Sequence, residues 1–85
     1  MPRYLIEAYV TAQPGQLETA RRRAHRAAQL GEHVRYLRTT FVPRDETCFH
    51  LFDAPSSAAL GAATRLAELD HLRIVEAVEA EAGCS

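Results

Sequence analysis

The stretch VRYLRTTFVPRDETCFHLFD, residues 34–53, decides the fold, because two runs of alternating β-forming residues flank the turn sequence PRDE. If this turn places Val42 opposite Thr47, the two runs pair as an antiparallel hairpin with a defined register. Side chains alternate between the two faces of a strand, so Cys48 and His50 project from the same face. The hairpin therefore brings two candidate metal ligands to one side of a sheet.

This register predicts that the two faces of the hairpin differ in character. One face is small and mostly apolar, which suits the lining beneath helices, and the other mixes large apolar residues with charges. We expect the first face to hold Leu37, Thr39, Phe41, Cys48, His50 and Phe52. The same face should continue on the first and last strands of the chain with Ile6, Ala8, Val75 and Ala77. We expect the second, open face to hold Leu5, Glu7, Tyr9, Tyr36, Arg38, Thr40, Phe49, Leu51, Asp53, Ile74, Glu76 and Val78.

The rest of the chain supplies a strand and a helix on each side of the hairpin. A helix is indicated where apolar residues recur every three or four positions, and a strand where β-branched and aromatic residues cluster between turn signals. Ser56 or Ser57 is a good N-cap for the second helix, and Gly31 ends the first. The predicted elements are a strand at 4–10, a helix at 16–30, a helix after residues 56–57 and a strand at 72–81.

The order strand, helix, strand, strand, helix, strand is that of a ferredoxin-like α+β fold. It predicts a four-stranded antiparallel sheet with both helices on one face. The second face of the sheet would then carry exposed apolar side chains in a monomer. We therefore expect the chain to form a homodimer through this open face.

Length and composition predict one domain and argue against nucleic acid or a membrane as a partner. The 85 residues are 47% hydrophobic and 25% charged, with a net charge of −1, which predicts a single globular domain over residues 1–85. This balance argues against nucleic acid as a partner, and no long apolar run predicts a membrane span or a signal peptide. Cys48 and Cys84 are too few for a disulfide framework and fit reduced thiols, so we expect a cytoplasmic protein.

Cys48 and His50 have three possible roles. They could supply two ligands of a metal site, although no second Cys or His pair lies near them in sequence. They could instead pack as a buried thiol and a neutral imidazole, which is the more common state of such residues. A nucleophilic Cys48 activated by His50 is the third possibility.

The remaining histidines lie where solvent is expected and give a second set of metal candidates. His25 falls on the polar side of the first helix, His33 follows Glu32, and His71 follows Asp70. An imidazole beside a carboxylate suits a borderline divalent ion at a surface site. Chance surface histidines would give the same pattern.

Charged and phenolic side chains on the open face form a candidate ligand pocket. Arg38 could pair with a carboxylate or hold a small anionic ligand, with Glu7 or Glu76 as a general base and a tyrosine as a hydrogen-bond donor. A plain salt bridge that fixes the dimer is the alternative. The pocket candidates are Glu7, Tyr9, Tyr36, Arg38, Asp53 and Glu76.

Four segments resemble a small bacterial domain family of unknown function that includes an actinobacterial nickel-binding protein. They are MPRYLIE at 1–7, VRYLRTT at 34–40, VPRDETCFHLFDAPS at 42–56 and RIVEAV at 73–78. The resemblance implies a ferredoxin-like homodimer that holds nickel at its surface, with a role in sequestration or detoxification. Members of the family often have a second cysteine where this chain has His50, and no metal ligand is carried over.

Three functions follow as expectations. The first is a homodimeric protein that binds nickel or another divalent metal through exposed histidines and carboxylates, without an organic cofactor. The second is a small-molecule-binding protein or enzyme that uses the open sheet face of a dimeric α/β barrel. The third is an interaction module without a ligand. The sequence has no glycine-rich phosphate loop, CxxC, HExxH or nucleophile elbow, which favours a binding protein over an enzyme.

Overall fold

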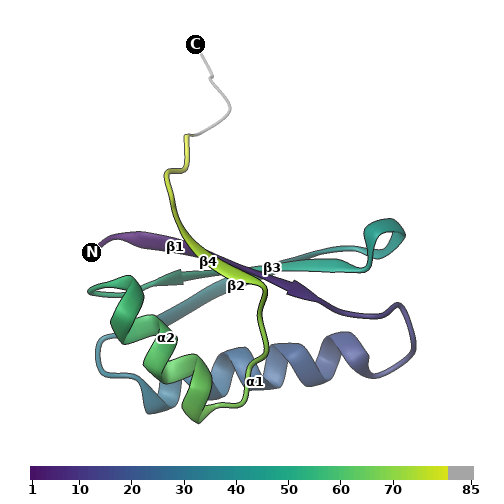
Figure 1. Cartoon of the computed structure of the whole chain (residues 1–85), viewed down its shortest axis with the longest axis horizontal. Coiled ribbons are helices and arrows are strands. Elements are labelled where there is room, and N and C mark those ends of the chain that lie inside the picture. Colours follow the sequence, from purple (N-terminus) through teal and green to yellow (C-terminus); the bar gives the residue numbers. More distant parts are fainter. Residues whose placement is uncertain (81–85) are drawn as a thin grey trace.

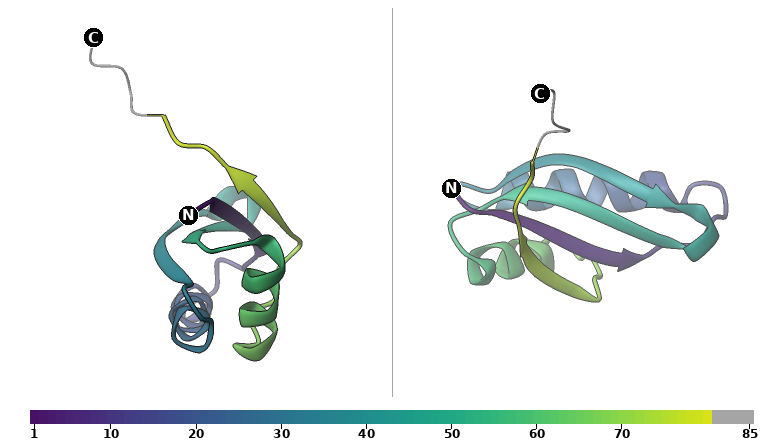
Figure 2. Two further views of the ribbon diagram at one scale, coloured as in Figure 1. Left: turned by 90° about the vertical axis from the view of Figure 1, so that its left-hand side faces the viewer. Right: turned by 90° about the horizontal axis from the view of Figure 1, so that it is seen from above.

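The computed structural model describes residues 1–80. These residues form a four-stranded antiparallel sheet with both helices on one face (Figure 1). The strand order is β2-β3-β1-β4, so the ferredoxin-like prediction is confirmed. Views from the side and from above show α1 and α2 together beneath the sheet (Figure 2). The elements are β1 (Arg3–Tyr9), α1 (Gln16–Leu30), β2 (Arg35–Val42), the 3₁₀ turn η1 (Pro43–Asp45), β3 (Thr47–Asp53), α2 (Ser57–Leu66) and β4 (Arg73–Ala77).

The hairpin between β2 and β3 has the predicted register at its turn end. Val42 pairs with Thr47, and Thr39 pairs with His50. The turn is a short 3₁₀ segment closed by Glu46, whose φ of 49° lies in the left-handed region. Cys48 and His50 therefore lie on the helix-covered side, as predicted, and both are fully buried.

A β-bulge changes the register at the start of β2 and corrects one predicted site residue. Arg38 pairs with Leu51, but Tyr36 pairs with Phe52, so Leu37 is an extra residue without a partner across the strands. Tyr36 therefore lies on the helix-covered side, where it packs against the core. Its predicted place on the open face was wrong, because one extra residue reverses the face of everything beyond it.

Strand β4 has the opposite phase from the predicted one. Ile74 pairs with Ile6 of the covered face, which sends Val75 and Ala77 to the open face. Glu76 is consequently on the helix side of this edge strand and is exposed there. The predictions of Ile74 and Glu76 on the open face, and of Val75 and Ala77 on the helix-covered face, were therefore wrong. The strand also ends at Ala77, and the last residue of the predicted span lies outside the described residues.

Alanine-rich helices let the core form close to the sheet. Ala24 and Ala27 of α1 are completely buried, as is Leu60 of α2. They pack in one cluster with Ile6 and Phe52, the two largest apolar side chains that are completely buried on the sheet. Short side chains on the helices leave room for these larger ones, so the two layers pack closely around this cluster.

The start of α2 and the end of α1 each depend on one residue. Ser56 is the N-cap of α2, because its side-chain oxygen accepts a hydrogen bond from the Ala59 amide at 3.1 Å. Gly31 follows α1, and a Cβ built there would lie 2.7 Å from the Val34 side chain and 2.8 Å from that of Ala63. Glycine is therefore required by the close approach of the two helices. Among residues 1–80, no helix is long and apolar enough to cross a membrane.

Candidate functional site

Cys48 and His50 belong to a closed polar network inside the core. His50 Nδ1 lies 2.7 Å from the hydroxyl oxygen of Thr39, and the Cys48 sulfur lies 3.3 Å from His50 Nε2. The Tyr36 hydroxyl in turn hydrogen-bonds to the Thr39 hydroxyl. A neutral imidazole has one donor and one acceptor nitrogen, so both of its nitrogens have partners here.

Burial sets the protonation of this pair. Desolvation raises the pKa of Cys48 to about 11 and lowers the pKa of His50 to about 4. At neutral pH the thiol is protonated and the imidazole is neutral, which is the reverse of an activated thiolate pair. The network has the character of a structural core cluster. The second cysteine, Cys84, lies outside the described residues.

The open face contains an arginine–carboxylate cluster, as predicted, but some of its residues differ from the predicted ones. Asp53 is held by Arg3, whose Nε and Nη2 donate to its two oxygens at 2.9 and 3.3 Å. This hydrogen-bonded ion pair lowers the pKa of Asp53 below its ordinary value. Glu79 accepts hydrogen bonds from both Arg3 and Arg38. Arg3 and Glu79 were not predicted, although a period of two from Leu5 places Arg3 on this face.

The other candidates on the open face also have partners. Glu7 accepts a hydrogen bond from Arg73 at 2.7 Å, across the β1–β4 pair. The Tyr9 hydroxyl donates to Glu46 at 2.9 Å, and this carboxylate raises the pKa of Tyr9. These two candidates, together with Arg38 and Asp53, are thus engaged in contacts within the chain.

An apolar centre lies between these ion pairs on the open face. Leu5 pairs with Leu51 on one side and Val75 on the other, and Phe49 continues the same face. Leu51 is 5% exposed, while the other three are partly exposed. The described elements leave this face uncovered, because both helices lie on the opposite side (Figure 2). An apolar centre with a charged rim is the usual composition of a protein interface.

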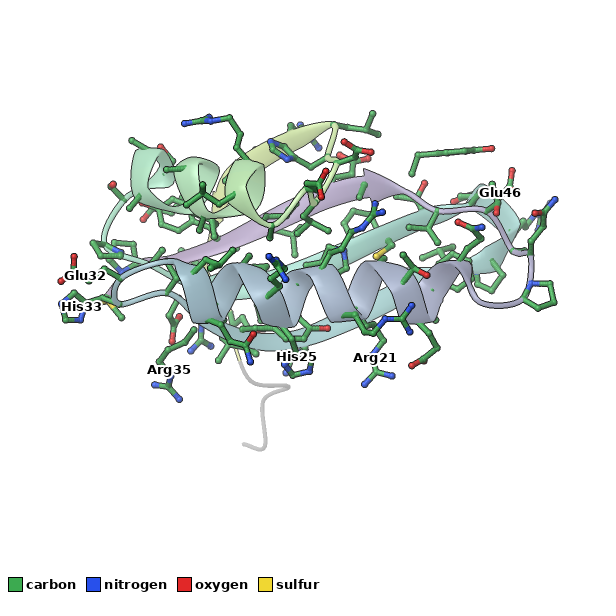
Figure 3. The ribbon with its side chains drawn as sticks, turned by 90° about the horizontal axis from the view of Figure 1, so that it is seen from below. Arg21, His25, Glu32, His33, Arg35 and Glu46 are labelled. Atoms are coloured by element: carbon green, nitrogen blue, oxygen red, sulfur yellow. The ribbon has the colours of Figure 1, made fainter. Side chains whose placement is uncertain are left out.

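The three predicted surface histidines lie on separate segments. His25 is exposed on α1, with its ring edge-on to Tyr36 at a centroid distance of 4.8 Å. Glu32 and His33 lie together at one end of the molecule, in the loop between α1 and β2 (Figure 3). Within residues 1–80, no three His, Cys, Asp or Glu side chains gather closely enough to hold a metal ion. The histidines therefore do not form one shared site in a single chain.

His71 differs from the other two because one of its ring nitrogens is fixed by the backbone. Its Nδ1 donates a hydrogen bond to the carbonyl oxygen of Leu69 at 3.2 Å. This bond selects the tautomer in which Nε2 carries the lone pair, an arrangement typical of metal-binding histidines. His71 is exposed and lines an open hollow together with Glu68 and Asp70.

The fold and these contacts define a ferredoxin-like domain with an uncovered sheet face. The structure is similar to that of SCO4226 from Streptomyces coelicolor A3(2), with a TM-score of 0.75 and 18% sequence identity over 92% of this chain and 98% of that chain. At this identity the likeness shows the fold alone. No protein-family model matches the sequence, and no curated protein is significantly similar to it.

Proposed function

We propose that this chain is a small homodimeric protein that binds a divalent metal ion at its surface through His71. The observation that supports the proposal is the hydrogen bond from His71 Nδ1 to the Leu69 carbonyl, which leaves Nε2 in an open hollow without a partner among residues 1–80. Of the predicted surface histidines, His71 is the one whose ring has this bond. An oriented imidazole loses less rotational freedom when it binds a metal.

The donors around His71 fit an open metal site. Asp70 and Glu68 line the same hollow, and an imidazole nitrogen with carboxylate oxygens suits a borderline divalent ion. Because the described residues of one chain do not bring three donors together, water or a second copy would complete the coordination. Such a site binds and releases its ion readily, as a handling protein requires.

The open face of the sheet supports the homodimer. Its apolar centre at Leu5, Phe49, Leu51 and Val75 is surrounded by the ion pairs of the rim, a pattern that suits an interface between two copies. Two copies that meet through the same face form a closed two-fold dimer. Burial of the apolar centre supplies the free energy of association.

Nickel is the proposed ion, and sequestration or handling of nickel the proposed role. The identity of the metal rests on the family that the sequence resembles. The role is assigned to the cytoplasm, where Cys48, a free and buried thiol, would stay reduced.

Calorimetric titration of nickel into the tag-free protein tests the metal site. We expect His71→Ala to weaken binding about tenfold or more, because it removes the oriented imidazole. The double variant His25→Ala with His33→Ala is the matched control, and it should bind nickel as the wild type does. Equal binding by the wild type and His71→Ala would refute the assignment.

Sedimentation of an open-face variant tests the dimer. We expect Leu5→Lys to sediment as a monomer at concentrations where the wild type is a dimer, because it places a charge at the apolar centre. Leu66→Lys is the control: Leu66 lies on α2, away from this face, and is 64% exposed. A Leu5→Lys protein that stays dimeric would show that the copies associate through another surface.

A further inference from the structure

A cavity of about 220 Å³ lies between the end of β1, the first turns of α1 and the loop before β4. It exists because α1 has 15 residues and α2 only 10, so α2 does not cover the sheet along the whole length of α1. Its floor is apolar, formed by the buried residues Ala8, Val10 and Leu69. The cavity is smaller than sites for drug-sized ligands, which restricts it to a small molecule.

A buried polar group without a partner lies directly behind the wall of the cavity. The hydroxyl oxygen of Thr11 is buried, and it has no hydrogen-bond partner among the described residues. A buried hydroxyl without a partner is unfavourable, so such groups in folded proteins are usually satisfied by water or a ligand. The packing behind this wall of the cavity therefore leaves one polar group unsatisfied.

The mouth of the same cavity has one positive and one negative side chain. Arg23 comes from α1, and Asp70 from the loop before β4. Neither makes an ion pair or side-chain hydrogen bond within residues 1–80, whereas the neighbouring Arg21 pairs with Glu18 at 3.0 Å. A guanidinium can hold a carboxylate bidentately, and a carboxylate can accept hydrogen bonds from an ammonium group.

We propose that this cavity binds a small zwitterion of the α-amino acid class. Arg23 holds the carboxylate of the ligand, and Asp70 holds its ammonium group. The apolar floor receives a short aliphatic side chain. A simple anion would meet the repulsion of Asp70, and a simple cation that of Arg23, so the paired charges select a molecule that has both.

Titration of the ¹⁵N-labelled protein with L-alanine, L-valine and L-serine, followed by NMR, tests the site. We expect saturable shifts of the amides around Thr11 and Arg23 for at least one of these amino acids below roughly 10 mM. Propionate and ethylamine, which each carry one of the two charges, should bind about tenfold more weakly. Absence of saturable shifts with all three amino acids, or equal binding of propionate, would overturn the proposal.

Variants assign the roles of the two charges. Arg23→Gln and Asp70→Asn should each weaken amino-acid binding about tenfold while the spectrum stays that of a folded protein. Arg26→Gln is the matched control, because Arg26 lies on the same helix outside this cavity. Arg23→Gln should leave nickel binding at His71 unchanged, which separates this site from the metal site although Asp70 borders both. Equal binding by Arg23→Gln and Arg26→Gln would contradict the proposal.

Discussion

Two polar clusters lie on the helix-covered side of the same sheet and differ in one respect. The side chains of Thr39 and Cys48 each satisfy one ring nitrogen of His50, and the imidazole is completely buried. Thr11 and Arg23 line one cavity, and their polar groups have no partners among the described residues. The difference separates structure from function: a satisfied cluster stabilises the fold, whereas an unsatisfied one next to a cavity is a candidate binding site.

Removal of the His50 ring should have the largest effect on stability. We expect His50→Ala to lower the free energy of unfolding by about 2–4 kcal/mol, because it leaves a cavity and removes the partner of Thr39. Urea denaturation measures this value. His25→Ala, which changes an exposed histidine, should cost less than about 1 kcal/mol. Similar losses in the two variants would show that the network is not structural.

Acid should destabilise the protein through the same residue. Because the pKa of His50 is lowered to about 4 in the folded protein, the unfolded chain binds the extra proton first as the pH falls below about 6.5. The free energy of unfolding should therefore fall by about 3 kcal/mol in total through His50. The fall begins near pH 6.5 and ends near pH 4. Urea denaturation across this range should show the decline in the wild type. His50→Gln should lack this component; an unchanged pH dependence would contradict the assignment.

A pair of isosteric threonine variants tests the comparison itself. Thr39→Val should destabilise by about 1 kcal/mol, because it removes a hydroxyl that bonds to His50. Thr11→Val should be neutral or should stabilise by about 1 kcal/mol, because it removes a buried hydroxyl without a partner. Thermal and urea unfolding report both values. The comparison fails if the two substitutions destabilise equally.

The fold could be predicted from the sequence where a turn and a hydrophobic pattern agree. The PRDE turn set Val42 opposite Thr47, and this placed Cys48 and His50 in the core. The predicted register holds as far as Arg38 and fails at the start of β2, because the bulge at Leu37 leaves no clear sequence signal. In β4, Ile74 and Val75 are adjacent and both apolar, so the hydrophobic pattern does not decide which of them faces the helices. The predicted assignment of faces in this strand was therefore wrong.

The candidate sites depend on features that a linear pattern does not contain. His71 was one of three predicted surface histidines, but its bond to the Leu69 carbonyl comes from the conformation of the loop. The cavity at Thr11 arises from the unequal lengths of α1 and α2 and from the approach of a loop distant in sequence. The sequence does not distinguish Arg23 from the other arginines of α1, because the absence of a partner for it among the described residues is a property of the folded chain.

Anomalous diffraction at the nickel edge, from crystals grown with nickel, is the most direct test of the proposed function. We predict a peak beside Nε2 of His71 and two copies joined through the apolar centre of their open sheet faces. A nickel peak elsewhere with none at His71, or copies that associate only through their helices, would contradict the account.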